Sequence, residues 1–408
     1  MQGPFPARST EVAAAADLSN RVFRPVNQFA TGTMHLEFPL VFSEQHPENL
    51  WIMKEGEKVV SLVGLLERNV FISCYPIRTA ALGTVCTDPA YRGQGLASQI
   101  LQKLREHLRQ RGVRLLIISG GRSLYRRIGA VNAGLVRWVN APALPVAAEQ
   151  AAAASGRAVP PWVVREATPD DLPWVLRLYE REPVRFERSL ADLRAFYSAL
   201  PHAYAGARFR RLWVAVASGG ASGRSANPIL AYLVTDGPAP AAAGVGHGAE
   251  SSPPVWYAME WGGTRRVVWQ MARTVVARYH VESVSFPLPE VDMDLAAAAR
   301  QDGIDYDNLS WASWGGTFVA LDPAGLVSDL KSLLGCELAR GLTAGLARGV
   351  ITGESLPAIL FGASKGWWDG DRKGWTDQLE QLAGVSGEAL AEHPLPLPLV
   401  WGSTLNFV

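Results

Sequence analysis

The sequence has few cysteines, no excess of charge of either sign and no long apolar run, and each absence excludes a class of protein. Only 3 cysteines occur in 408 residues, at Cys74, Cys86 and Cys336. They are too few and too far apart for a disulfide framework or a metal cluster, so we predict a reducing compartment and no bound metal. The 39 basic and 38 acidic residues nearly cancel, which leaves no electrostatic footprint for nucleic acid.

Apolar residues are plentiful but are never gathered into a long run. No stretch is long enough to span a bilayer, and the first 26 residues contain no apolar core of signal-peptide length. We therefore expect a cytoplasmic protein without a membrane partner. A chain of 408 residues, of which 48% are hydrophobic, should form two or three globular domains.

The first part of the chain alternates between helical and strand patterns, which predicts a mixed α/β fold. In residues 94–110 the apolar positions recur at helical spacing, and the continuously apolar residues 114–119 are typical of a buried strand. The other elements expected here are helices at 11–23 and 33–41 and strands at 49–53, 59–66 and 79–86.

After a stretch rich in alanine and proline the same order of elements starts again, which indicates a tandem duplication. Strands are expected at 163–166, 212–217, 229–234, 255–261 and 281–286, and helices from 169 and at 264–279. Helices at 326–334 and 356–361 and an extended, proline-stiffened tail should follow. We therefore divide the chain into an N-terminal domain (1–143), a linker (144–161), a second domain (162–322) and a C-terminal segment (323–408).

Residues 82–98 combine a strand, a glycine-containing turn and the start of a helix. Such a turn places backbone N–H groups at a helix N-terminus, where the helix dipole favours negative charge. Gly93 and Gly95 have no Cβ and leave the backbone open to close approach, and Arg92 adds a positive charge. These features predict a cradle for a pyrophosphate. P-loop and Rossmann patterns fit poorly. The alternative is that the two glycines only end a strand and start a helix.

Two motifs carry a resemblance to a known family. Residues 91–97 (YRGQGLA) resemble motif A of the GNAT superfamily of acetyltransferases, and residues 119–129 (SGGRSLYRRIG) resemble its motif B. The order of the units is similar to that of the enhanced-intracellular-survival group, in which two fused GNAT units precede a sterol-carrier-like domain. The resemblance implies two tandem GNAT-like units followed by a short helical or extended C-terminal appendage. The second unit should be degenerate, because residues 259–266 contain no motif A.

The resemblance also implies that acetyl-CoA, as co-substrate, lies where two strands part. The implied cofactor-binding residues are Val85, Cys86, Thr87, Arg92, Gly93, Gln94, Gly95, Leu96, Ala97, Ser98, Ser119 and Gly120. Tyr125 would protonate the departing thiolate. The alternative for Tyr125 is a half-buried aromatic residue whose hydroxyl group bonds the backbone.

No residue of the strand before motif A can serve as a general base, so the base stays open. His35 and Glu37 are candidates. The C-terminal carboxylate of Val408 is another, because in the related group the chain terminus reaches into the active site of the first unit. Cys86 is a candidate nucleophile, but a lone cysteine on a buried strand more commonly serves as a small apolar residue.

These features predict an acetyl-CoA-dependent N-acetyltransferase that acts on a primary amine of a small molecule or peptide. The alternative is a non-catalytic acyl-CoA-binding or regulatory protein that has kept the pyrophosphate cradle. An acyl donor longer than acetyl also stays open. The sequence identifies neither the acceptor nor the oligomeric state, so a homo-oligomer is one of the open alternatives.

Overall fold

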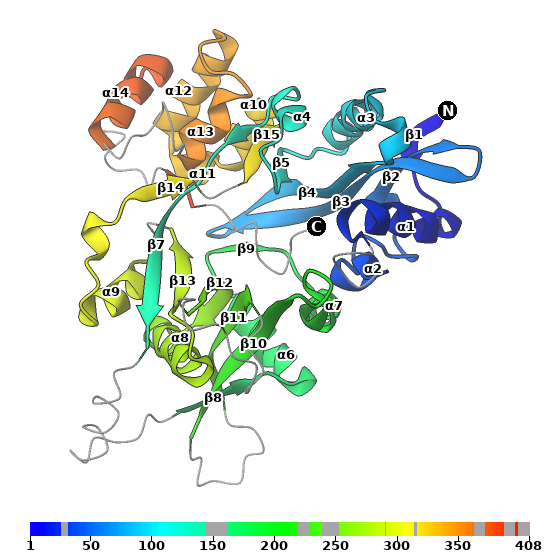
Figure 1. Ribbon diagram of the computed structural model, residues 1–408. Coiled ribbons are helices and arrows are strands. Elements are labelled where there is room, and N and C mark those ends of the chain that lie inside the picture. Colours follow the sequence, from blue (N-terminus) through cyan, green and yellow to red (C-terminus); the bar gives the residue numbers. More distant parts are fainter. Residues whose placement is uncertain are drawn as a thin grey trace, which may run out of the picture. The chain divides into compact units, whose positions relative to one another are not determined.

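The computed structural model describes residues 1–25, 32–143, 162–218, 228–238, 253–289, 291–313, 316–362, 372–386 and 396–398. The chain forms two compact units (Figure 1). Unit 1 consists of Met1–Val136, Pro183–Glu187 and Trp311–Val408, and unit 2 of Arg137–Glu182 and Arg188–Ser310. The units therefore divide the chain at other residues than the domains expected from the sequence, and the C-terminal segment belongs to unit 1. The expected linker, 144–161, lies outside the described residues.

Unit 1 is built on a mixed sheet in which one pair of central strands is parallel. The path through the sheet is β1 (Gln2–Pro6), β2 (Leu50–Glu55), β3 (Lys58–Ile72), β4 (Tyr75–Thr87), β5 (Leu115–Ile118), β15 (Thr317–Ala320) and β6 (Val131–Asn132). β4 and β5 are parallel, and the other neighbours are antiparallel. The short strand β9 (Val184–Phe186) pairs with β3.

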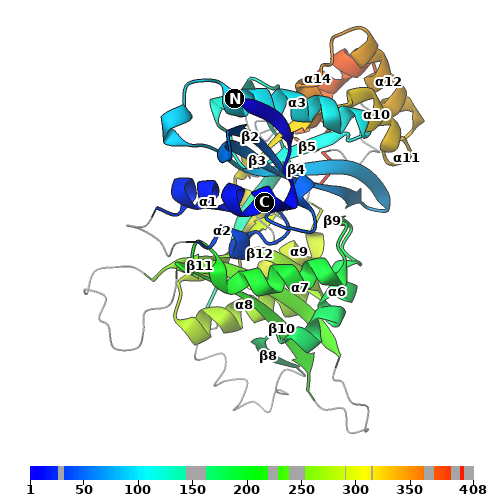
Figure 2. The ribbon, with the colours of Figure 1, turned by 90° about the vertical axis from the view of Figure 1, so that its right-hand side faces the viewer.

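Helices cover both faces of this sheet. Figure 2 shows α3 (Leu96–Gln110) on one face and α1 (Val12–Phe23) with α2 (Met34–Glu37) on the other. The residues of α3 that the spacing placed on a buried face are buried, namely Leu96, Ile100, Leu101, Leu104 and Leu108. The short α4 (Ser123–Arg126) follows β5. The two faces of the sheet therefore belong to two separate apolar clusters, one with α3 and one with α1.

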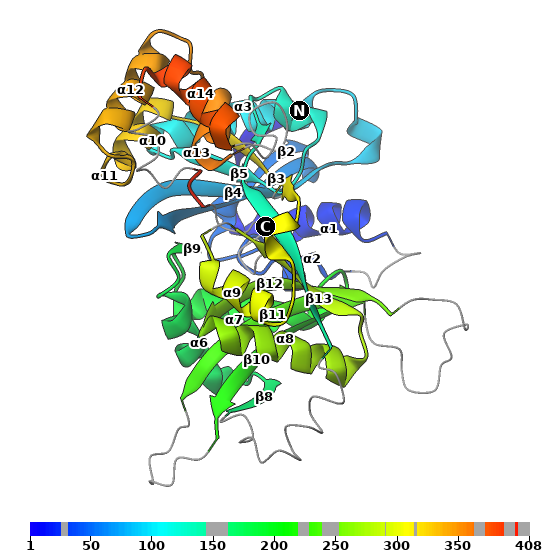
Figure 3. The same ribbon diagram turned by 90° about the vertical axis from the view of Figure 1, so that its left-hand side faces the viewer.

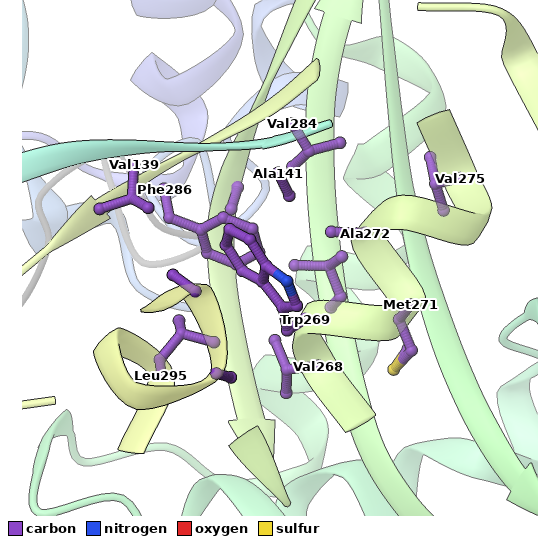
Figure 4. Packing of buried hydrophobic residues seen from close by; sticks show 14 of the residues in the cluster. Val139, Ala141, Val268, Trp269, Met271, Ala272, Val275, Val284, Phe286 and Leu295 are labelled. Carbon is purple, nitrogen blue, oxygen red and sulfur yellow. The ribbon is translucent and has the colours of Figure 1, made fainter. Parts of the chain in front are cut away.

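Unit 2 contains a sheet of the same design. Its path is β8 (Trp162–Glu166), β10 (Arg208–Ala217), β11 (Ile229–Pro238), β12 (Val255–Gly263), β13 (Ser283–Leu288) and β7 (Leu135–Pro142). Here β12 and β13 form the parallel pair, and the other neighbours are antiparallel. The helices are α6 (Leu172–Tyr179), α7 (Leu190–Ala199), α8 (Arg265–Tyr279) and α9 (Met293–Gln301). Trp269 of α8 packs on Phe286 of β13 in the core (Figure 4).

The first six strands of the two sheets match in order and direction, which confirms a mixed α/β fold with two tandem units of the same design. From the first strand to the sixth, each path takes three antiparallel steps, one parallel step and one further antiparallel step. The sixth strand of each is encoded out of order. In unit 1 that strand is β15, which follows unit 2 in the chain. In unit 2 it is β7, which follows the first five strands of unit 1 in the chain.

The C-terminal part of unit 1 is helical. Figure 3 shows a group of helices that contains α10 (Pro323–Asp329), α11 (Lys331–Leu334), α12 (Cys336–Ala347), α13 (Ser355–Phe361) and α14 (Arg372–Ala383). Of these, α12 and α14 were not expected from the sequence, and the helix expected at 326–334 is divided near Leu330. In the described residues after β15 there is no strand. Most of the tail expected to be extended lies outside the described residues. None of the described helices has the length and apolar character needed to cross a membrane.

Candidate active site

The central strands of unit 1 part from each other at one end. Their pairing runs from Thr79 opposite Leu115 to Leu82 opposite Ile118, where β5 ends. β4 continues to Thr87, so residues 83–87 have no strand on that edge within the described chain. The expected cofactor-binding residues Val85, Cys86 and Thr87 lie on this open edge. An extended ligand with amide groups can therefore pair with the backbone there, as a further strand would.

A bulge in β4 lies beside the point where the strands part. On β3, Leu62 pairs with Cys86 and Gly64 with Gly83, so that a single β3 residue faces both Thr84 and Val85. Thr84 has φ 47°, in the left-handed region. A bulge leaves its extra residue outside the regular ladder of hydrogen bonds. The bulge therefore interrupts the β3–β4 ladder next to the point where β4 and β5 part.

The turn between β4 and α3 presents a row of free N–H groups. Gly93 and Gly95 have φ 79° and 72°, which favour glycine, and α3 begins directly afterwards at Leu96. The first helical bond runs from the Gln99 N–H group to the Gly95 carbonyl oxygen at 3.0 Å. Within the described residues, the N–H groups of residues 93–98 have no hydrogen-bond partner. The N–H groups of the expected loop residues, Gln94, Ala97 and Ser98 included, could therefore hold an anion.

The two glycines of this turn have no close neighbour across the backbone. A Cβ added to Gly93 or Gly95 would have no atom of the described residues within 4 Å. Arg92 is exposed, and its Nε donates to the Thr87 carbonyl oxygen at 3.4 Å. The cradle and the open edge of β4 are therefore continuous along the chain, and both fit the pyrophosphate and amide groups of a CoA thioester.

Two pairs of side chains hold the turn in place. Asp88 accepts a hydrogen bond from the Ala90 N–H group at 3.1 Å and pairs with Lys58 at 2.9 Å. The hydrogen bond from Lys58 lowers the pKa of Asp88 below its usual range. The Tyr91 hydroxyl donates to Glu55 at 2.5 Å. The sequence analysis missed Lys58 and Glu55, because they lie on other strands and no local pattern marks them.

Ser119, Gly120 and Tyr125 form the other wall of the gap. Ser119 and Gly120 directly follow β5, and the Gly120 carbonyl oxygen accepts a hydrogen bond from Thr317 at 2.8 Å. Tyr125 of α4 is 7% exposed, and its ring lies 3.4 Å from the position of a Cβ on Gly120. Burial raises the pKa of Tyr125. The Tyr125 ring therefore lies beside the end of β5 with its phenol in the protonated form.

The other candidate residues of unit 1 have different surroundings. Cys86 is 5% exposed and packs on the α1 side of the sheet, where burial raises its pKa to about 12, so its thiol is not a nucleophile at neutral pH. The Glu37 carboxylate accepts hydrogen bonds from Arg24 and Thr33, each at 2.8 Å. His35 is exposed. Val408 lies outside the described residues.

Unit 2 has the same parting of strands but no cradle. The pairing of β12 with β13 ends at Tyr257 opposite Ser285, although β12 continues to Gly263. Thr264 alone connects β12 to α8, whereas residues 88–95 connect β4 to α3. The Glu182 carboxylate accepts a hydrogen bond from the Gly263 N–H group at 3.2 Å and pairs with Arg265 at 2.5 Å.

Side chains also fill the gap of unit 2. Trp261 packs edge-on against Phe286 with ring centroids 5.3 Å apart, and its indole donates to Asp292 at 3.0 Å. In unit 2 the Glu182 carboxylate therefore lies where a bound anion would lie in unit 1, and Trp261 lies where an extended ligand would pass. This agrees with the degenerate second unit expected from the missing motif A.

The comparisons with known proteins agree with this geometry. Residues 5–132 match the family model described as an acetyltransferase (GNAT) domain. A GCN5-related N-acetyltransferase from Anabaena variabilis is similar in structure, with TM-score 0.52, 11% identity, and coverage of 79% of this chain and 73% of that chain. One from Kribbella flavida has TM-score 0.51, 13% identity, and coverage of 80% and 72%. Identities this low show a shared fold. No curated protein matches the sequence.

Proposed function

Because residues 5–132 match the model of a GNAT acetyltransferase domain, we propose that the chain transfers an acetyl group from acetyl-CoA to a primary amine of a small molecule or peptide. The observation that supports this most directly is the continuity of the open edge of β4 with the free N–H groups of residues 93–98. The first matches the amides of pantetheine and the second a pyrophosphate. In unit 2 the corresponding places are filled, so we assign the reaction to unit 1.

In the proposed reaction the acceptor nitrogen attacks the thioester carbonyl carbon, and the carbon–sulfur bond then breaks. The charge that develops on the carbonyl oxygen is stabilised by a backbone N–H group of β4 near Val85 or Cys86. Tyr125 gives its proton to the thiolate of CoA. The raised pKa of Tyr125 suits this role, because the hydroxyl group keeps its proton until the thiolate forms.

A base must take one proton from the attacking ammonium or amine, and we propose the terminal carboxylate of Val408. Glu37 is engaged by Arg24 and Thr33, which leaves it less suited. Adding a few residues after Val408 would move that carboxylate and should lower kcat at least tenfold without changing the affinity for acetyl-CoA. Steady-state kinetics of the extended chain, beside a chain extended before Met1 by the same residues, measure this. Full turnover by the C-terminally extended chain would remove Val408 from the mechanism.

The alternative function, acyl-CoA binding without turnover, is separated by release of CoA. Acetyl-CoA is supplied with a panel of primary amines, and the free thiol is measured with a chromogenic reagent. Amine-dependent release supports the transferase. Saturable binding of acetyl-CoA without release by any amine of the panel would favour the binding protein.

We further propose a tandem duplication as the origin of the two units and a cytoplasmic location. The duplication is supported by the matching sheets. The location is supported by the free cysteines Cys74, Cys86 and Cys336, since a reducing compartment keeps thiols free.

A further inference from the structure

The side chain of Thr84 lies directly over Gly64 on the neighbouring strand. A Cβ on Gly64 would lie 2.1 Å from Thr84 Oγ1 and 2.7 Å from Val41 Cγ1. Both separations are far below van der Waals contact, so no larger residue fits at position 64 unless Thr84 moves. Gly64 is therefore required for space rather than for its backbone conformation. At this point the side chain of Thr84 in the β4 bulge occupies the space that a side chain at position 64 of β3 would need.

Two local features of Thr84 are energetically unfavourable. Its φ of 47° is rare for a residue branched at Cβ, because the side chain crowds the backbone in the left-handed region. Its Oγ1 is buried and, within the described residues, has no hydrogen-bond partner. Strained backbone of this kind collects at functional sites, where the surrounding structure maintains it. Glycine would adopt the same φ without strain, so a threonine at this position indicates that its side chain has a role.

We infer that Thr84 and Gly64 are positioning residues that hold the bulge of β4 in the shape that directs a backbone N–H group towards the acetyl carbonyl oxygen. This inference rests on the proposed function. The bulge lies where β4 and β5 part, next to the last paired residues Leu82 and Ile118. In the proposed binding mode the pantetheine runs along β4 from residues 93–98 towards that point. The Thr84 side chain lies against Gly64 of β3, and it acts on the donor only through the backbone.

The shape of the Thr84 side chain, and not its hydroxyl group, does this work. The hydroxyl oxygen lies over Gly64, is buried and, within the described residues, has no hydrogen-bond partner. Valine has the same branched shape without the hydroxyl group. Thr84→Val should therefore keep the bulge, whereas Thr84→Gly removes the side chain and relaxes the backbone.

Calorimetric titration of the full chain with CoA and, separately, with acetyl-CoA tests the inference. The ratio of the two affinities isolates contacts with the acetyl group, because both ligands share the pyrophosphate and pantetheine. In Thr84→Gly we expect the affinity for CoA to be unchanged. The ratio of the acetyl-CoA affinity to the CoA affinity should be about three- to tenfold lower than in the wild type, which is the net contribution of one hydrogen bond. Gly64→Ala should lower the ratio in the same way, and Thr84→Val should keep it.

The outcomes separate the two levels of the account. Thr84→Gly is expected to fold, because glycine adopts a φ of 47° freely. A wild-type ratio in Thr84→Gly would overturn the inference and leave the proposed function standing. A ratio lowered equally in Thr84→Val and Thr84→Gly would also overturn it, because the hydroxyl group would then be the essential part. No binding of either ligand by the wild type would remove the proposed function and the inference with it.

Discussion

Replacing Tyr125 with phenylalanine is expected to lower kcat for acetyl transfer by about 100-fold or more, with little change in acetyl-CoA affinity. The ring fills the same buried place beside Gly120, so the packing is kept. Phenylalanine has no hydroxyl group, however, and cannot give a proton to the departing thiolate. Because this proton is transferred after the donor has bound, the effect should fall on kcat and not on binding. Steady-state kinetics with the best amine of the panel, together with calorimetry, measure both quantities.

A matched control is Tyr197→Phe in unit 2, where the hydroxyl donates to the Ala167 carbonyl oxygen at 2.8 Å. That variant should keep its kcat. Burial raises the pKa of Tyr125 above its usual value of 10.0, so kcat of the wild type should not fall through loss of this proton below about pH 10. Equal turnover by the wild type and Tyr125→Phe would remove Tyr125 as the general acid.

Replacing Glu260 with alanine is expected to destabilise unit 2 by about 3–5 kcal/mol, because it leaves a buried guanidinium without its carboxylate. Arg188 is fully buried and donates to both oxygens of Glu260, at 2.9 and 2.7 Å. Its guanidinium also stacks on Tyr179, 3.8 Å from the ring centroid. Glu260 lies opposite Val234, beside the bulge of β12. Cys86 has the equivalent position in β4, where it lies opposite Leu62 beside the bulge. The pair therefore stabilises the part of unit 2 that corresponds to the proposed reaction centre of unit 1.

Urea unfolding followed by tryptophan fluorescence measures this loss, since Trp213, Trp256 and Trp269 are buried in unit 2. Replacing both partners, as Arg188→Met with Glu260→Leu, should recover much of the stability, because no charge is then left buried. The exposed pair Arg300–Asp307 gives a matched control, and Asp307→Ala should leave the unfolding midpoint unchanged. An unchanged midpoint in Glu260→Ala would contradict this account of unit 2.

The features that sequence reasoning predicted well are those that neighbouring residues determine. The helix predicted at 94–110 begins at Leu96 and ends at Gln110, and the strand predicted at 114–119 is Leu115–Ile118. Local spacing is sufficient for both, because the apolar residues that pack into the core form one helix face in the first case and one short continuous run in the second. The glycine turn before α3 was likewise evident, since its conformation depends on Gly93 and Gly95 themselves.

Features that depend on distant residues were not predicted. The apolar pattern of β15 does not reveal that it pairs with β5 and not with strands of the preceding unit. The bulge at Thr84 depends on the missing side chain of Gly64, and a sequence reader would place a positive φ at Gly83 instead. The short connection at Thr264 was visible in the sequence, and the length of the strand-to-helix connection could have shown that unit 2 lacks a cradle.

The most direct test of the central claim, that the turn before α3 binds acetyl-CoA, is calorimetric titration of acetyl-CoA into three proteins. These are the wild type, the double variant Arg92→Ala with Gly95→Glu, and the control Gly112→Glu. Gly95 and Gly112 lie at opposite ends of α3, have φ 72° and 76°, and have no atom within 4 Å of an added Cβ. The two glutamates therefore carry similar strain. We predict saturable binding by the wild type and by Gly112→Glu and none by the double variant. Equal binding by all three proteins, or no binding by any, would contradict the account.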